Sequence, residues 1–128
     1  MTIPERVLIA GAGPVGLVAA ANLVRRGIPV TVFEVGSTLS EESRASTFHP
    51  PTLDMLQTLG AAGPLQEQGL VAPQFQYRTK DGLLAEFDFG LIAALTEFPY
   101  RVQCEQSKLT RILYEQLRTL PNFALEFD

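Results

Sequence analysis

The sequence has little of what several classes of protein require. Its one cysteine, Cys104, excludes an internal disulfide and fits the reducing environment of the cytoplasm. The sequence also has only one histidine, His49, so we predict neither a metal centre nor a Cys–His catalytic pair. Basic residues are also scarce, because 10 Lys and Arg stand against 14 Asp and Glu and the net charge is −4. We therefore exclude nucleic acid and anionic membrane surfaces as expected partners.

Only one long stretch lacks charge, and it lies near the N-terminus. Residues 7–24 form a run of 18 uncharged residues, a length that suits a membrane span or a signal peptide. However, Gly11, Gly13, Pro14 and Gly16 interrupt its first half and prevent one helix from covering the run. We therefore predict neither a membrane span nor a signal peptide, and we expect the protein in the cytoplasm.

The remaining composition is that of an ordinary globular protein. The 128 residues are 46% hydrophobic and 19% charged, enough for one domain with its own core. The first part predicts a strand at residues 6–10, a glycine-rich turn at 11–16, a helix at 14–26 that Gly27 ends, and a strand at 29–33. A strand, a helix and a strand in this spacing form a parallel βαβ unit.

The rest of the chain carries further elements. Residues 36–51 are rich in Ser, Thr and Pro, which favours a loop. After this loop we expect a helix at 53–59, with Thr52 as its N-cap and Gly60 as the residue that ends it. A β-hairpin is expected next, with strands at 75–79 and 83–89 and its turn at Asp81-Gly82. An amphipathic helix at 107–120 and a strand at 123–127 are expected at the end of the chain. The predicted fold class is α/β: a Rossmann-like βαβ unit with a parallel sheet and an inserted β-hairpin.

The most informative motif is Gly-Ala-Gly-Pro-Val-Gly at residues 11–16. It follows a predicted strand and opens a predicted helix, which is the context of a dinucleotide-binding turn. In such a turn Gly11 makes the tight bend, Gly13 admits a pyrophosphate close to the backbone, and Gly16 lets the helix pack near the sheet. The helix N-terminus offers N–H groups and partial positive charge to the phosphates, and a proline is tolerated there. We predict that a cofactor contacts Gly11, Gly13, Pro14, Val15 and Gly16.

Glu34 lies 18 residues after Gly16, at the end of the second predicted strand. A carboxylate there accepts hydrogen bonds from a ribose hydroxyl. It repels a 2′-phosphate, and no arginine follows in residues 35–37, so NADP is disfavoured while FAD and NAD both remain. About 90 residues, the hairpin among them, separate Glu34 from Phe123. An insertion of that size does not suit a minimal NAD domain.

Three blocks of sequence carry a family resemblance: residues 7–34, residues 43–60 and residues 106–113. Together they resemble the N-terminal part of the class A flavoprotein monooxygenases, the relatives of para-hydroxybenzoate and phenol hydroxylases. The first block is shared by many flavoproteins, whereas the blocks at Arg44 and Gln106 are more specific. The resemblance implies a partial FAD-binding domain over residues 1–128, with Arg44 against the pyrophosphate side of FAD and Gln106 near the flavin.

Other interpretations of single residues stay open. Arg44 could be a surface arginine of its loop, and Gln106 could be a helix cap, with Gln103 as the alternative glutamine. We expect His49 to be a turn residue and Cys104 to be structural. The aromatic residues Phe75, Tyr77, Phe87 and Phe89 suit sheet packing or a substrate-side wall. No acid–base pair stands out, so no catalytic residue is predicted, which agrees with chemistry performed mainly by a cofactor.

The resemblance implies an enzyme that uses FAD, NAD(P)H and O2 to hydroxylate a small aromatic, phenolic substrate. The alternatives are another FAD- or NAD-linked oxidoreductase and a non-catalytic nucleotide-binding module. The family's later Gly-Asp motif is not found before Asp128. We therefore expect the natural chain to continue, and we expect these 128 residues alone to hold little FAD and to self-associate.

Overall fold

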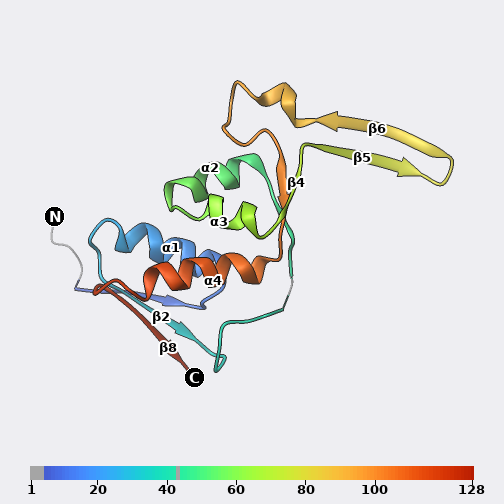
Figure 1. Cartoon of the computed structure of the whole chain (residues 1–128). Coiled ribbons are helices and arrows are strands. Elements are labelled where there is room, and N and C mark those ends of the chain that lie inside the picture. Colours follow the sequence, from blue (N-terminus) through green and yellow to red (C-terminus); the bar gives the residue numbers. More distant parts are fainter. Residues whose placement is uncertain (1–4, 43) are drawn as a thin grey trace. The chain divides into compact units, whose positions relative to one another are not determined.

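A computed structural model describes residues 5–42 and 44–128. The chain divides into two compact units. The first unit consists of residues 1–44 together with residues 106–128, and the second consists of residues 45–105. Figure 1 shows the elements of both.

The first unit is built on a parallel sheet of three strands, in the order β1 (Val7–Ala10), β2 (Val30–Glu34) and β8 (Phe123–Phe127). Its register pairs Val7 with Val30, and Val30 with Phe123. Two helices, α1 (Pro14–Val24) and α4 (Gln106–Leu117), pack against each other beside this sheet (Figure 1). The predicted α/β class, βαβ unit and parallel sheet are therefore confirmed.

Apolar side chains spaced by helical and strand periods form the core of this unit. Buried core residues are Leu17, Ala20, Ala21, Val24, Val30, Val32, Leu109, Leu113 and Leu117. Small residues on α1 allow close packing, because alanine adds little bulk between helix and neighbour. This core positions the turn before α1 and the C-terminal end of β2.

Both helices end earlier than the sequence predicted. Helix α1 ends at Val24 rather than residue 26, because the N–H groups of Arg26 and Gly27 bond to carbonyls three residues back, those of Leu23 and Val24. Gly27 then adopts a φ of +79°, as expected for the residue that turns the chain away. Helix α4 ends at Leu117 rather than at residue 120, where the Leu120 N–H bonds to Leu117 O at 2.9 Å. Pro121 follows and has no N–H with which to continue a helix.

The second unit contains an antiparallel sheet of three short strands, in the order β3 (Thr47–Phe48), β7 (Arg101–Gln103) and β4 (Leu70–Ala72). Helices α2 (Pro50–Thr58) and α3 (Ala62–Glu67) contact each other. The hairpin of β5 (Gln74–Thr79) and β6 (Gly82–Asp88) leads into the short 3-10 helix η1 (Phe89–Ile92). The core of the second unit includes Leu53, Leu56, Leu65 and Val102, all fully buried.

Several expectations for the second unit were wrong. The predicted loop at 36–51 contains β3 and the first two residues of α2, since two prolines occupy the start of that helix, where a missing N–H costs little. His49 is therefore the N-cap, and Thr52 lies inside the helix with its N–H bonded to His49 O at 3.0 Å. Strands β4 and β7 and helix α3 were not predicted. The hairpin was predicted, but β5 begins one residue earlier than expected and β6 begins and ends one residue earlier, and Gly82 has a φ of +140°.

Within residues 5–42 and 44–128, no helix combines the length and apolar character that a membrane crossing requires.

Candidate functional site

The turn between β1 and α1 has the shape that a phosphate-binding turn needs. Gly11 adopts a φ of +98°, a region that favours glycine, and its N–H bonds to Phe33 O on β2 at 2.7 Å. Gly13 is the N-cap of α1, and its carbonyl accepts from Leu17 N at 3.0 Å. The first N–H groups of α1, those of Val15 and Gly16, have no intrahelical partner and point out of its N-terminus. That end of the helix attracts anions, and its first turn contains no acidic residue.

The three glycines of the motif have different surroundings. A Cβ on Gly16 would lie 2.0 Å from Gly11 O and 3.2 Å from its carbonyl carbon, so Gly16 allows α1 to approach the turn. A Cβ on Gly13 would meet nothing within 4 Å. The space beside Gly13 is therefore open to a ligand, whereas the space beside Gly16 is filled by the protein itself.

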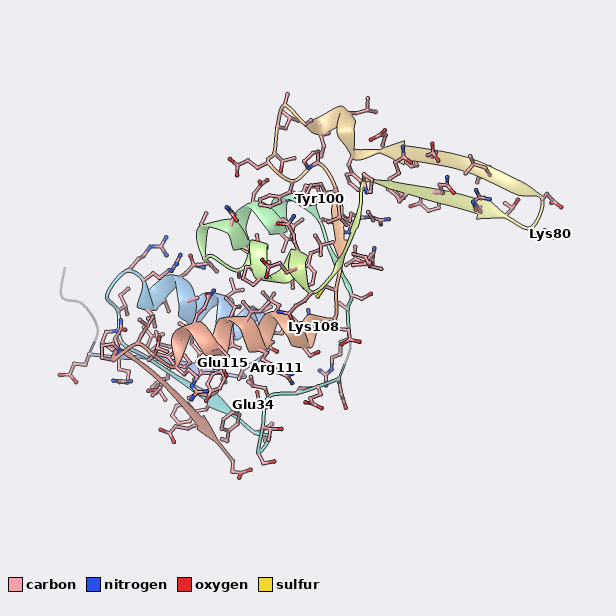
Figure 2. All side chains as sticks on the ribbon, in the orientation of Figure 1. Glu34, Lys80, Tyr100, Lys108, Arg111 and Glu115 are labelled. Carbon is pink, nitrogen blue, oxygen red and sulfur yellow. The ribbon has the colours of Figure 1, made fainter. Side chains whose placement is uncertain are left out.

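Glu34 ends β2 directly beside this turn. Its Oε2 accepts a hydrogen bond from Ala12 N at 2.7 Å, and its Oε1 accepts from Gly36 N at 3.1 Å. These N–H groups, that of Ala12 first, hold the pKa of the Glu34 carboxyl below its usual range, although desolvation raises it. Glu34 is therefore an anion at neutral pH, and each oxygen keeps a lone pair for a hydroxyl donor. Figure 2 labels Glu34 on its strand.

A pocket of about 300 Å³ lies in the first unit and brings most of the predicted site residues together. Its lining residues are Ala12, Gly13, Pro14, Glu34, Val35, Ser40, Glu42, Arg44, Gln106, Ser107 and Thr110. Gly13, Pro14 and Glu34 from the βαβ unit thus share one cavity with Arg44 and Gln106, which are 62 residues apart in the sequence. Gly11, Val15 and Gly16 do not line it. They shape the turn and the start of α1.

One arginine, Arg44, lines the pocket, and its side chain is held only by an exposed ion pair. The Arg44 guanidinium pairs with the Glu42 carboxylate at 3.0 Å, and its side chain is 78% exposed. Exposed pairs of this kind contribute little energy, so Arg44 can exchange Glu42 for a stronger anion at small cost. A second ion pair, Glu41 to Arg111 at 3.0 Å, joins the same loop to α4, where Figure 2 labels Arg111.

Gln106 opens α4 and presents a neutral amide to the pocket. The alternative glutamine, Gln103, belongs to the second unit, where its side-chain oxygen accepts from Thr47 Oγ1 at 2.9 Å. Of the two glutamines, Gln106 is the one that lines the same pocket as Glu34 and Arg44.

Sequence reasoning missed several lining residues. The backbone N–H of Ala12 binds Glu34, but a backbone contact leaves no signal in residue type. Ser40 and Glu42 lie in a loop without periodicity. Thr110 is buried within the pattern of α4, and its hydroxyl donates to Ser107 O at 2.7 Å. No motif singles out these positions.

His49 and Cys104, the two residues that could have indicated a metal site or a Cys–His catalytic pair, both lie in positions that suit a structural role. His49 caps α2, and Cys104 is buried with its thiol 3.8 Å from Gln68 O. Among the described residues, no group of three His, Cys, Asp or Glu side chains is arranged to hold a metal ion. The open space beside Gly13, the anionic Glu34 and the exchangeable Arg44 fit a dinucleotide with its phosphates at the helix and its ribose at β2.

Proteins of known sequence are similar to this chain. The FAD binding domain family matches residues 5–128. The chain is 32% identical over 125 residues to para-nitrophenol 4-monooxygenase of Pseudomonas sp. (strain WBC-3), covering 97% of this chain and 31% of that protein. It is 35% identical over 129 residues to 6-hydroxy-3-succinoylpyridine 3-monooxygenase of Pseudomonas putida (strain DSM 28022 / S16), covering 100% of this chain and 33% of that protein.

A solved structure agrees with these relatives. The crystal structure of p-nitrophenol 4-monooxygenase from Pseudomonas putida DLL-E4 matches with a TM-score of 0.89 and 32% identity, over 96% of this chain and 32% of that one. The chain therefore spans about a third of the length of these relatives. Because the family match over residues 5–128 includes every residue that lines the pocket, this chain belongs to the FAD binding domain family.

Proposed function

We propose that this chain is the FAD-binding part of a flavin-dependent monooxygenase that hydroxylates a small phenolic substrate, using NAD(P)H and O2. The observation that carries the proposal is the single pocket that joins Gly13 and Glu34 to Arg44 and Gln106. The relatives support it, because those described above are named as monooxygenases of p-nitrophenol and of a hydroxypyridine.

Each pocket residue has a proposed role. The N–H groups at the start of α1 hold the pyrophosphate, and Gly13 leaves room for it. Glu34 accepts hydrogen bonds from the adenosine ribose. Arg44 leaves Glu42 and pairs with the phosphate side of the cofactor, since the pyrophosphate carries two negative charges and a carboxylate carries one. Gln106 donates or accepts a hydrogen bond at the flavin without adding charge.

Bound FAD supplies the redox chemistry, and the residues described here bind and orient it. No acid–base pair among the described pocket residues has the geometry of general catalysis, because the Glu34 carboxylate is engaged by two backbone N–H groups. We therefore assign binding and positioning roles to this chain and no proton-transfer role.

The test uses the complete gene product. After purification, a visible flavin spectrum, NADH or NADPH oxidation that a phenol stimulates, and a hydroxylated product would support the proposal. Flavin with NAD(P)H oxidation but no hydroxylated product from any phenol tested would identify another flavin oxidoreductase. Binding of NAD without flavin, or of neither nucleotide, would overturn the proposal.

We also propose a cytoplasmic location. The lone cysteine is buried at the thiol and needs no oxidising compartment. Fractionation of cells that express the complete gene product tests this, and recovery in a secreted fraction would contradict it.

A further inference from the structure

Two neighbouring glutamates of the loop after β2 hold two different arginines. Glu41 pairs with Arg111 of α4 at 3.0 Å, across 70 residues of sequence. Glu42 pairs with Arg44 at 3.0 Å, within the loop itself. Of these two glutamates, only Glu42 lines the pocket that Glu34 and Arg44 also line. The two carboxylates are therefore alike in charge and sequence position but differ in their relation to the pocket.

The pair between Glu42 and Arg44 is local. The Nη2 and Nε groups of Arg44 donate to one oxygen, Glu42 Oε2, at 3.0 and 3.4 Å. The Glu42 N–H donates to Ser40 Oγ at 3.3 Å, a turn in which a serine hydroxyl holds the backbone two residues on. Because the pair depends only on this short segment, it forms without a ligand.

The charges that line the pocket do not match an anionic ligand while this pair is intact. Among the described lining residues, Arg44 carries the single positive charge, and Glu34 and Glu42 are both acidic. The pyrophosphate of a dinucleotide brings two further negative charges. Glu42 therefore occupies the cation that the phosphates need, and its own charge repels them as long as it stays beside them.

The exposure of the pair sets the size of this competition. The side chains of Arg44 and Glu42 are 78% and 72% exposed, and water screens exposed pairs, so the paired state is favoured over the separated one by only about one- to fivefold. A ligand that needs free Arg44 binds only to the fraction of molecules in which the pair is open. Its apparent affinity is then lowered by about two- to sixfold.

We propose that Glu42 is an internal competitor of the cofactor, whose carboxylate occupies Arg44 in place of the pyrophosphate and lowers the affinity of the pocket for FAD. The inference rests on the proposed function, and it adds a lining residue that weakens cofactor binding to those that support it. The exchange also assists release, because the Glu42 carboxylate takes the place of the phosphate as FAD leaves and the guanidinium is not left without a partner.

The experiment measures the affinity of the complete gene product for FAD. The flavin-free protein is titrated with FAD, and binding is followed by flavin fluorescence. In dilute buffer, Glu42→Gln should bind FAD about two- to sixfold more tightly than the unmodified protein, although the substitution changes a residue of the pocket wall. In about 1 M NaCl, where charges are screened over roughly 3 Å, this gain should largely disappear.

Two matched variants identify the cause of the gain. Glu41→Gln removes the same charge from the neighbouring residue, which pairs with Arg111 and not with Arg44, so it should give no gain in FAD affinity. Arg44→Gln should weaken FAD binding. In that background Glu42→Gln should give no further gain, because no guanidinium is left to release, and the two changes are therefore not additive. Equal melting temperatures of the variants show that the fold is intact.

Three results would overturn the inference: FAD binding that is unchanged or weaker in Glu42→Gln, an equal gain in Glu41→Gln, or a gain that persists beside Arg44→Gln. The last two would show general repulsion and not competition for Arg44. Failure of the proposed function is distinct: if FAD binds but no phenol is hydroxylated, the titration still decides the inference.

If the unmodified protein binds no FAD, the same variants are tested by equilibrium dialysis with NAD, which carries the same pyrophosphate. Tighter NAD binding in Glu42→Gln than in Glu41→Gln supports the inference. Equal binding of NAD by the two variants, or no binding by either, overturns it.

Discussion

The backbone N–H of Ala12 donates a hydrogen bond to Glu34 Oε2 across a distance of 2.7 Å. This contact joins the glycine turn before α1 to the end of β2. Glu34 thus has two roles in the account, since it positions the turn through its backbone contacts and keeps lone pairs for a ribose hydroxyl. Its position follows from the βαβ unit, whereas its contact with Ala12 appears only in the folded chain.

The first prediction concerns stability and pH. Glu34→Gln should lower the free energy of unfolding at pH 7 by about 1–3 kcal/mol, the scale of hydrogen bonds to a charged group. Because the pKa of Glu34 is lowered in the folded state, its contribution is complete above the pKa of an ordinary glutamate, about 4.3, and is lost as pH falls through the folded value. Thermal unfolding from pH 7 to pH 3 should show the two proteins converging at the acid end.

Glu126→Gln provides the control, since it removes an exposed carboxylate from β8. A Glu34→Gln protein as stable as the original at pH 7, or a difference that grows as pH falls, would refute the stabilising role of the Ala12 contact.

The second prediction concerns ribose recognition. Glu34→Ala should weaken FAD binding to the complete gene product by about 1–3 kcal/mol, because hydrogen bonds from ribose hydroxyls to a carboxylate are lost. Titration of the flavin-free protein with FAD measures the change. Unchanged affinity would remove Glu34 from the cofactor site.

The third prediction separates two glycines of one motif. Gly13→Val should fold normally but lose its flavin, because the new side chain has free space in the protein and would fill the place of the pyrophosphate. Gly16→Ala should instead lower the melting temperature, because its Cβ would lie 2.0 Å from Gly11 O. Flavin absorbance and thermal unfolding of both variants test the pair. Normal flavin content in Gly13→Val would make the motif structural only.

The fourth prediction concerns self-association of these 128 residues. Leu91 and Leu95 are 88% and 82% exposed in the second unit, and exposed apolar side chains favour association. Sedimentation velocity should show larger species as concentration rises, and Leu91→Gln combined with Leu95→Gln should reduce them. A monomer at all concentrations would contradict this prediction.

The parts of the fold that follow local rules could be predicted from the sequence. Strand β8 lies at the predicted residues 123–127, and the hairpin forms about the Asp81-Gly82 turn. Helix α3 was missed because it has six residues and includes Gly63 and Pro64, both poor helix formers. Strands β4 and β7 have three residues each and exist only through pairing between distant segments, which no local pattern reveals.

The site shows the same division. Gly13 and Glu34 were predicted as cofactor-binding residues from a motif whose spacing has a physical reason. Arg44 and Gln106 were predicted from the family resemblance alone, because neither lies in a pattern that fixes its position. The structure places both on the pocket that Gly13 and Glu34 line. The contact made by the backbone N–H of Ala12 could not be predicted from the sequence, because it depends on the shape of the turn and not on its side chains.

The most direct test of the account is a crystal structure of the complete gene product with FAD bound. The account predicts the pyrophosphate beside Gly13, the adenosine ribose within hydrogen-bond distance of Glu34, and both Arg44 and Gln106 close to the cofactor. A structure with both of those side chains more than about 8 Å from FAD, well beyond direct hydrogen-bond reach, would contradict it.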